Sequence, residues 1–299
     1  MRLRSTGLML MAVGALAGVC AYAQTTRFGS VPEGVTKHPG IAYAQIEGVD
    51  PERLSLDLYA PDDAADAPIM LYVHGGGWAH GDRAAVWRKP EFFCGSGWLF
   101  AAADYRLVPQ VTPAEQVRDV ARAVAWLHER AAEFGGDPER IYLMGHSAGA
   151  HLVALASTDP APLQEAGLGP GALSGTVVLD AGALDLYTHM GRVGRLPLFA
   201  DAFGTDPAAW GPLSPLTYVA PDTDIPPMLV LTQGAPRRVA DAQRFVDAMV
   251  ACGLTADLVY LPEHTHGDVN RLVGEPGDPR TEAIVGFLTG LGETLTAPQ

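Results

Sequence analysis

Short runs of apolar residues alternate with amphipathic segments along most of the chain. From residue 68 onward the apolar runs have the length and composition of buried strands, and helical patterns lie between most of them. Strands that alternate with helices usually pair in parallel, so the pattern predicts a largely parallel sheet with helices on both faces. The expected buried strands are 69–74, 98–103, 141–146, 175–180, 228–233 and 256–261.

Two earlier segments have a different pattern. Residues 41–47 and 53–59 alternate apolar with polar residues, which predicts an antiparallel pair joined through Asp50-Pro51. This pair brings the sheet to about eight strands. Residues 24–40 are rich in Gly, Pro and Thr and are expected to be irregular. We expect residues 24–299 to form a single α/β domain.

The clearest helix covers residues 113–134. Thr112 and Glu115 have the spacing of a capping box, and Pro113 occupies the first helical position. An apolar stripe at helical spacing follows, formed by Val117, Val120, Val124, Leu127, Ala131 and Phe134.

One long segment interrupts the alternation of strands and helices. Residues 184–226 contain several Gly and Pro residues and no clear strand. A segment of this length inside a compact domain is typical of a lid or a substrate-binding loop.

Composition narrows the possible partners. Hydrophobic residues make up 48% of the 299 residues, which is enough for a sizeable core. The formal net charge is -14, and a surface this acidic repels phosphate backbones and anionic lipids. We therefore expect no nucleic-acid partner. No feature of the sequence indicates an oligomeric state.

The N-terminus has the pattern of a signal peptide. Arg2 and Arg4 precede an apolar stretch, 8–19, that is too short to span a bilayer, and Ala21-Tyr22-Ala23 fits a cleavage site. Residues 1–23 are thus predicted to be a signal peptide, with a periplasmic or secreted mature protein. Cys94 and Cys252 would remain after cleavage. They could pair in an oxidising compartment, although two unrelated thiols are the favoured interpretation.

The strongest chemical motif is Gly145-His146-Ser147-Ala148-Gly149. An expected strand ends just before it and a helical pattern follows, which is the strand–turn–helix context of a nucleophile elbow. In such a turn the serine takes strained dihedral angles, and its hydroxyl projects above the sheet at a helix N-terminus. The motif predicts that Ser147 is a nucleophile.

A second motif, His74-Gly75-Gly76-Gly77-Trp78, follows the strand 69–74. Consecutive glycines let backbone amides approach a ligand, and an HGGG motif in this position forms one half of an oxyanion hole. The other half is the amide of the residue after the nucleophile, here Ala148.

These motifs, with ADYRLVP at 103–109, FGGDPERIYLMGHSAGAHL at 134–152 and Trp210 with Ser214-Pro215, resemble the α/β-hydrolase superfamily. The chain looks most like the HGGG-bearing esterases and lipases, in the hormone-sensitive-lipase-like and feruloyl-esterase-like branches. It also resembles kynurenine formamidases. The resemblance implies an oxyanion hole made by the amides of Gly76, Gly77 and Ala148, with Trp78 at the substrate.

The same resemblance places the catalytic base after the last strand. The loop ADLVYLPEHTHGDVN at 256–270 contains His264 and His266. Family members often carry a histidine four residues before an asparagine here, which favours His266, with Asn270 as that asparagine. His264 is the alternative. His74 is expected to support the oxyanion loop, and His128 and His189 to lie on the surface.

The acid of the expected triad is absent from its usual place. In this superfamily the acid usually lies about three residues past a glycine after the seventh strand, and Arg237 stands there. The superfamily also supplies the acid from the end of the sixth strand, where Asp180 follows an apolar run. Asp180 is favoured. Asp241, expected near a helix start, Asp185 and Asp268 remain alternatives.

Together these features predict an exported serine hydrolase that cleaves small carboxylic esters through an acyl-enzyme. An amide hydrolase of the arylformamidase or peptidase kind is an alternative, and a non-catalytic binding domain on the same fold is another. No cofactor or metal is implied, since the glycine-rich loop lacks the lysine of a phosphate-binding loop.

Overall fold

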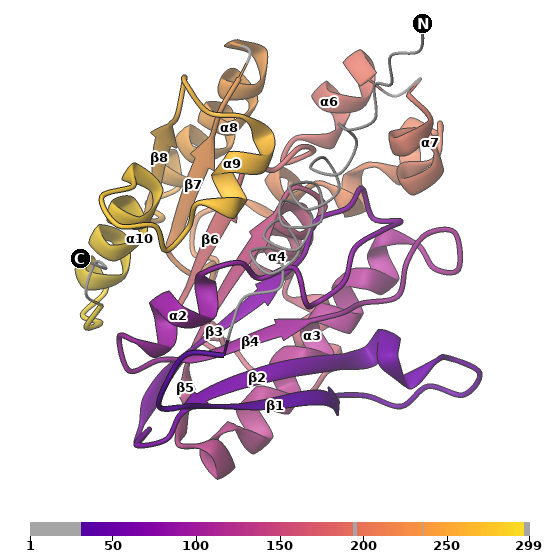
Figure 1. Cartoon of the computed structure of the whole chain (residues 1–299). Coiled ribbons are helices and arrows are strands. Elements are labelled where there is room, and N and C mark those ends of the chain that lie inside the picture. Colours follow the sequence, from indigo (N-terminus) through magenta and orange to yellow (C-terminus); the bar gives the residue numbers. More distant parts are fainter. Residues whose placement is uncertain (1–30, 194–195, 235, 296–299) are drawn as a thin grey trace, which may run out of the picture.

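One sheet of eight strands forms the centre of the molecule. The structure is a computed structural model that describes residues 31–193, 196–234 and 236–295, and within them the strand order is β1-β2-β4-β3-β5-β6-β7-β8. β1 pairs antiparallel with β2 and β2 with β4, while every other pair is parallel (Figure 1). The strands are β1 Val35–Ala42, β2 Ser55–Pro61, β3 Ala67–Val73, β4 Leu99–Ala103, β5 Gly136–His146, β6 Gly175–Leu179, β7 Met228–Thr232 and β8 Ala256–Tyr260.

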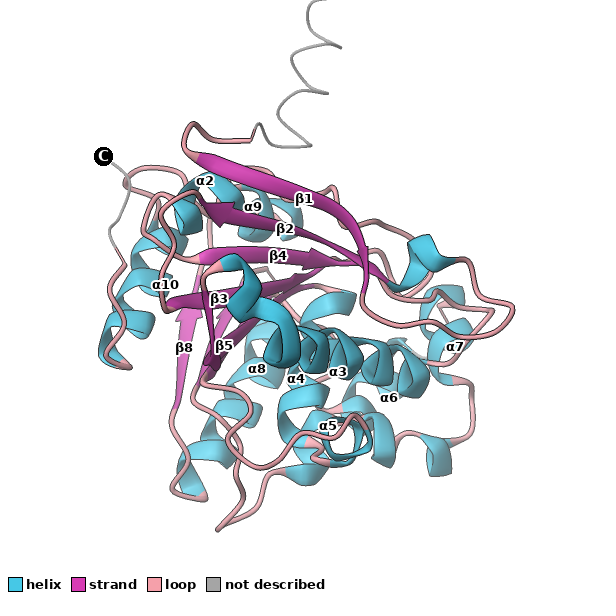
Figure 2. Cartoon of the chain, turned by 90° about the horizontal axis from the view of Figure 1, so that it is seen from below, coloured by secondary structure: helices cyan, strands magenta, loops and turns pink. Residues whose placement is uncertain are grey.

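Helices cover both faces of this sheet (Figure 2). The main helices on one face are α3, α4 and α8, and those on the other are α2, α9 and α10. The α-helices are α2 Lys89–Cys94, α3 Pro113–Arg130, α4 Ala148–Thr158, α5 Ala161–Glu165, α6 Leu186–Val193, α7 Pro197–Phe203, α8 Pro236–Ala251, α9 His266–Arg271 and α10 Pro279–Gly290.

Strand β3 illustrates how the sequence produces these layers. All seven of its residues are buried, as expected for a central parallel strand. Successive side chains of a strand point to opposite faces. Ile69 and Leu71 therefore pack in the core under α3 and α4, whereas Met70 and Tyr72 pack in the core under α2 and α10.

Most of the predicted elements are present. Each of the six apolar runs forms a strand, and the fold is that of an α/β-hydrolase. The helix predicted over 113–134 is α3, and a short 3-10 helix continues it over Ala131–Phe134. The Glu115 carboxylate accepts a hydrogen bond of 2.8 Å from the Thr112 amide, as the capping box requires.

The first antiparallel strand was placed wrongly. It covers Val35–Ala42 rather than 41–47, so part of the segment expected to be irregular is a strand. β1 lies at the edge of the sheet and has no buried residue, which leaves it without a clear apolar pattern. After it, Tyr43 is buried and Ala44 and Ile46 are partly buried without being a strand, and the Tyr43 hydroxyl donates to the Asp104 carbonyl. Asp50 caps a 3-10 helix, Pro51–Leu54, that leads into β2.

Residues 184–226 contain helices and no strand in the part that the structure describes. They form α6, α7 and the short 3-10 helices Pro207–Ala209, Gly211–Leu213 and Pro215–Tyr218. α6 and α7 lie at the same end of the molecule as α9 (Figure 1). Across all the described ranges, no helix is long and apolar enough to cross a membrane. The predicted signal peptide lies outside the described residues.

Candidate active site

Ser147 lies in the sharp turn between β5 and α4. Its backbone has φ 56° and ψ −114°, a positive-φ conformation that is rare for a residue with a side chain. The turn needs glycine on both sides. A Cβ on Gly145 would lie 2.3 Å from the Gly149 carbonyl oxygen, and one on Gly149 would lie 2.2 Å from that of Val73. The motif glycines therefore permit the strained turn that presents the Ser147 hydroxyl.

A hydrogen-bonded chain links Ser147 to a histidine and a carboxylate. The Ser147 Oγ lies 2.8 Å from His266 Nε2, and His266 Nδ1 lies 2.5 Å from Asp180 Oδ2. His266 is the first residue of α9, whose start is fixed by a capping box between Thr265 and Asp268. This arrangement is the geometry by which a hydroxyl is activated through an imidazole.

Asp180 comes directly after β6 and is completely buried. Gln233, just past β7, donates to Asp180 Oδ2 from its side-chain nitrogen at 2.7 Å, and Arg238 Nη1 donates at 3.1 Å. Burial raises the pKa of a carboxyl, but here the hydrogen bond from His266 and the charge of Arg238 outweigh it and lower the pKa of Asp180. The carboxylate is thus held ionised next to the imidazole.

Arg238 explains the missing acid of the seventh-strand loop. α8 begins at Pro236, so Arg237 and Arg238 stand in its first turn, and Arg238 binds the carboxylate that β6 supplies. Sequence reasoning missed the roles of Arg238 and Gln233, because both depend on β6 and β7 being neighbours.

The other carboxylates that were weighed as the acid bind elsewhere. Asp241 lies beyond the first turn of α8, not at its start, and it binds Arg192 at 2.7 Å and Arg244 at 3.3 Å. Asp185 binds Arg244 at 2.8 Å. Asp268 serves the α9 cap and binds Arg271.

Two histidines differ from what was considered from the sequence: His264, the alternative base, and His189, expected on the surface. No hydrogen bond joins His264 to Ser147 among the described residues, and its amide donates to the Leu261 carbonyl. His189 was expected on the surface, but it is only partly exposed. Its ring packs 4.6 Å from that of Phe199, and burial lowers its pKa.

The expected oxyanion donors lie beside Ser147. None of the amides of Gly76, Gly77 and Ala148 donates a hydrogen bond to another described residue. A Cβ on Gly75 would lie 3.1 Å from the Ser147 Cβ, so the glycine loop packs against the elbow. Gly76 and Gly77 have φ of 129° and 61°, values that favour glycine. Ala148 is also the first residue of α4, where the helix dipole favours negative charge.

The side chains at the ends of the glycine loop are structural. The His74 ring stacks on Tyr105 at 4.4 Å, which agrees with the expected supporting role. Trp78 was expected at the substrate, but its side chain is only 3% exposed. Its ring packs against Phe199 and Phe203 of α7, and its Nε1 donates to His151 Nδ1 at 3.3 Å. Trp78 thus anchors α7 to the core.

A buried polar group holds α9, the helix that carries His266. The completely buried Lys89 donates to the Asn270 carbonyl at 2.8 Å, and the Tyr72 hydroxyl donates to Asn270 Oδ1 at 3.0 Å. At the other end of α9, His146 Nε2 donates to the His266 carbonyl at 2.9 Å. Burial and the nearby His266 lower the pKa of His146 to about 3, so this imidazole stays neutral. No sequence motif indicated these contacts.

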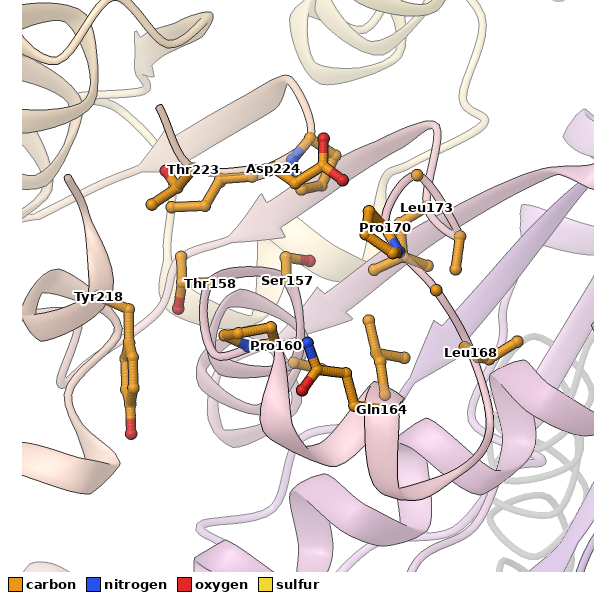
Figure 3. Close-up of a pocket in the computed structure, with 17 residues that line it drawn as sticks. Ser157, Thr158, Pro160, Gln164, Leu168, Pro170, Leu173, Tyr218, Thr223 and Asp224 are labelled. Atoms are coloured by element: carbon orange, nitrogen blue, oxygen red, sulfur yellow. The ribbon is translucent and has the colours of Figure 1, made fainter. Parts of the chain in front are cut away.

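Two pockets of similar volume lie at different distances from these residues. One of ≈ 460 Å³ is lined by the oxyanion loop, His146 and the start of α9. A more apolar pocket of ≈ 400 Å³ lies at the C-terminal end of α4, where Pro160, Leu168 and Tyr218 face it (Figure 3). It is separated from Ser147 by the length of α4, roughly 16 Å at 1.5 Å per residue. No group of His, Cys, Asp or Glu within the described ranges suits a metal ion, and Cys94 and Cys252 are both free thiols.

Known proteins similar to this chain are named as esterases. A family model described as BD-FAE matches residues 56–168. The probable isoprenylcysteine alpha-carbonyl methylesterase ICMEL1 of Oryza sativa is 30% identical over 73% of this chain and 55% of the relative. Esterase LipQ of Mycobacterium tuberculosis is 32% identical over 63% of this chain and 47% of the relative. The chain therefore spans about half the length of these curated relatives.

Solved structures of similar fold are esterases as well. A butyrate-bound esterase from Thermogutta terrifontis is 26% identical with a TM-score of 0.65, over 87% of this chain and 97% of that one. Esterase B from Lactobacillus rhamnosis has a TM-score of 0.69 at 22% identity, over 93% and 92% of the two chains. The fold is that of an α/β-hydrolase, and the chain is similar to esterases and lipases of the hormone-sensitive-lipase and feruloyl-esterase kind.

Proposed function

We propose that the protein is a serine carboxylesterase that cleaves small carboxylic esters through an acyl-enzyme. The observation that carries this proposal is the chain of short contacts from Ser147 Oγ to His266 Nε2 and from His266 Nδ1 to Asp180, at 2.8 Å and 2.5 Å. Its relatives are named as esterases, which supports the same reaction class.

In the acylation step the Ser147 Oγ attacks the ester carbonyl carbon while His266 Nε2 takes the hydroxyl proton. The negative charge that develops on the carbonyl oxygen is held by the amides of Gly76, Gly77 and Ala148. Each well-placed donor of this kind lowers the barrier by ~3 kcal/mol. The tetrahedral intermediate then collapses, and the leaving alcohol takes the proton from His266.

In the deacylation step a water molecule attacks the acyl-enzyme carbonyl and gives a proton to His266 Nε2. The second tetrahedral intermediate collapses, the acid product leaves, and the proton returns to Ser147. Asp180 keeps the proton of the neutral imidazole on Nδ1 and stabilises the imidazolium that forms in each step. The bonds from Gln233 and Arg238 keep this carboxylate in place.

The proposal is tested by labelling with a fluorophosphonate, which reacts only with an activated serine. Mass spectrometry of the parent protein should locate one adduct on Ser147, and the Ser147→Ala variant should remain unlabelled. Failure of the folded parent to react would contradict the proposal and favour a non-catalytic binding domain. The relative rates on an ester and on the amide of the same acid then separate an esterase from an amide hydrolase.

We also propose that the protein is exported and that the mature chain begins at Gln24. Support comes from the sequence alone, from the basic start, the short apolar stretch and Ala21-Tyr22-Ala23. N-terminal sequencing of the native protein tests this, and a chain that still begins at Met1 would contradict it.

A further inference from the structure

We propose that a cationic pocket beside the triad binds a carboxylate carried by the substrate, so that the enzyme prefers esters with a negative charge near the ester bond. This inference rests on the proposed esterase function and names its substrate class. The pocket, here called the arginine pocket, is formed by residues 181–185, α6 and the start of α8, and has a volume of ≈ 270 Å³. Arg192, Arg237 and Arg238 line it.

The arginine pocket has one more positive than negative charge, because Asp185 and Asp241 also line it. Arg192 is paired with Asp241 at 2.7 Å, and Arg238 with Asp180 at 3.1 Å. Arg237 is exposed and has no carboxylate within ion-pair distance among the described residues. The excess positive charge stands out in a chain of net charge -14. An anion of the substrate would supply the missing partner.

The position of Arg237 strengthens this argument. Arg237 and Arg238 lie in the first turn of α8, a helix of 16 residues. The N-terminus of a helix carries partial positive charge, so two cations there are unfavourable and an anion is favourable. Breaking such a local rule is typical of functional sites. A bound carboxylate would relieve the repulsion between the arginines and also meet the helix dipole.

The arginine pocket reaches the reacting atoms by one chain of hydrogen bonds. Arg238 binds the same oxygen, Asp180 Oδ2, that lies 2.5 Å from His266 Nδ1. His266 Nε2 in turn contacts the Ser147 hydroxyl. A ligand that contacts Arg238 is therefore separated from the nucleophile by three side chains, those of Arg238, Asp180 and His266.

A wall of side chains also connects the arginine pocket with the oxyanion loop. A Cβ on Gly77 would lie 2.3 Å from Leu198 of α7, so this leucine borders the loop. The neighbouring Phe199 packs against His189, which lines the arginine pocket. The side chains of α7 and α6 thus form a continuous line of contacts from the oxyanion loop to the arginine pocket. The volume of ≈ 270 Å³ is just below the range of ~300–1,000 Å³ usual for ligand pockets, which suits a carboxylate on a short chain.

Two pairs of esters test the proposal and locate the charge. Mono-4-nitrophenyl glutarate and 4-nitrophenyl pentanoate compare an anionic with a neutral acyl group, while 4-carboxyphenyl butanoate and phenyl butanoate compare the alcohol groups. The parent should have the higher kcat/KM for the anionic ester of one pair. Arg237→Gln should reduce that preference about tenfold, as expected for loss of a hydrogen bond to a charged group, and leave the neutral ester unchanged. Arg237→Lys should retain part of the preference.

The matched control is Arg53→Gln, which removes the same charge from another exposed arginine without an ion-pair partner among the described residues. This variant should keep the parent's preference. Added salt should weaken the preference in the parent and have little effect in Arg237→Gln, because salt screens exposed charges. An equal fall for both esters of a pair, or the same loss in Arg53→Gln, would overturn the proposal.

The test also separates this proposal from the esterase function. If the parent hydrolyses the neutral esters but shows no preference for charge, the arginine pocket is not an anion site and the esterase function stands. If the parent hydrolyses none of the esters, the esterase function fails. Calorimetric titration then measures the affinity of glutarate for the arginine pocket directly. Equal affinities for the parent and for Arg237→Gln would refute the proposed anion site.

Discussion

Arg238 donates a hydrogen bond of 3.1 Å to Asp180, from the helix that follows β7 to the residue that follows β6. The resemblance to α/β-hydrolases leads one to expect a carboxylate after β7. Here that place holds a cation, and the carboxylate stands one strand earlier. The two segments together still supply an ionised acid to His266 Nδ1.

Removal of the Arg238 charge should weaken catalysis only moderately. In Arg238→Gln the Asp180 carboxylate keeps its bonds from Gln233 and His266, so we expect turnover of a neutral ester to fall about tenfold, by part of the energy of a charged hydrogen bond. Arg238→Lys should restore most of the activity. Measured kcat values for the parent, Arg238→Gln and Arg238→Lys check this. If Arg238→Lys loses as much activity as Arg238→Gln, the positive charge at this position does not support catalysis.

The ionisation of Asp180 should appear in the pH dependence of stability. Its pKa in the folded protein lies below the usual 3.8, so Asp180 stabilises the fold above that pH, and this contribution disappears as the pH falls through the lower value. The difference in unfolding free energy between the parent and Asp180→Asn should therefore shrink as the solution is acidified below pH 3.8. Denaturant unfolding at several pH values measures it. If the difference in unfolding free energy instead grows on acidification, the pKa of Asp180 is not lowered in the folded protein.

The glycines of the elbow should be intolerant of even one methyl group. A Cβ on Gly149 would lie 2.2 Å from the Val73 carbonyl oxygen, so Gly149→Ala should lower the unfolding free energy by at least about 2 kcal/mol. Gly286, within α10, has nothing within 4 Å of an added Cβ. Gly286→Ala should instead raise stability by about 0.5–1 kcal/mol. Similar effects of the two substitutions would argue against the tight turn.

Local sequence patterns predicted the central part of this molecule well. The buried strands, α3 and the elbow at Ser147 each depend on residues close together in the chain, and a carboxylate directly after a buried strand was enough to favour Asp180. β1 was misplaced because an edge strand with no buried residue leaves a weak apolar pattern.

Features that depend on long-range packing could not be found in the same way. Arg238 meets Asp180 only because β6 and β7 are neighbours, and Lys89 meets α9 from a distant part of the chain. His189 and Trp78 were misjudged for the same reason, since the rings of both pack against Phe199 of α7, whose position no local pattern indicated.

The most direct test of this account is the turnover of 4-nitrophenyl butanoate by Asp180→Asn and Asp241→Asn, with unfolding midpoints as controls for misfolding. Asp180→Asn should favour the wrong imidazole tautomer and lose at least ~10² in kcat, since a matching change in a well-studied protease costs ~10⁴. Asp241 binds Arg192 and Arg244 instead of His266, so Asp241→Asn should cost little. A large loss in Asp241→Asn together with near-normal turnover in Asp180→Asn would contradict the assignment of Asp180 as the acid.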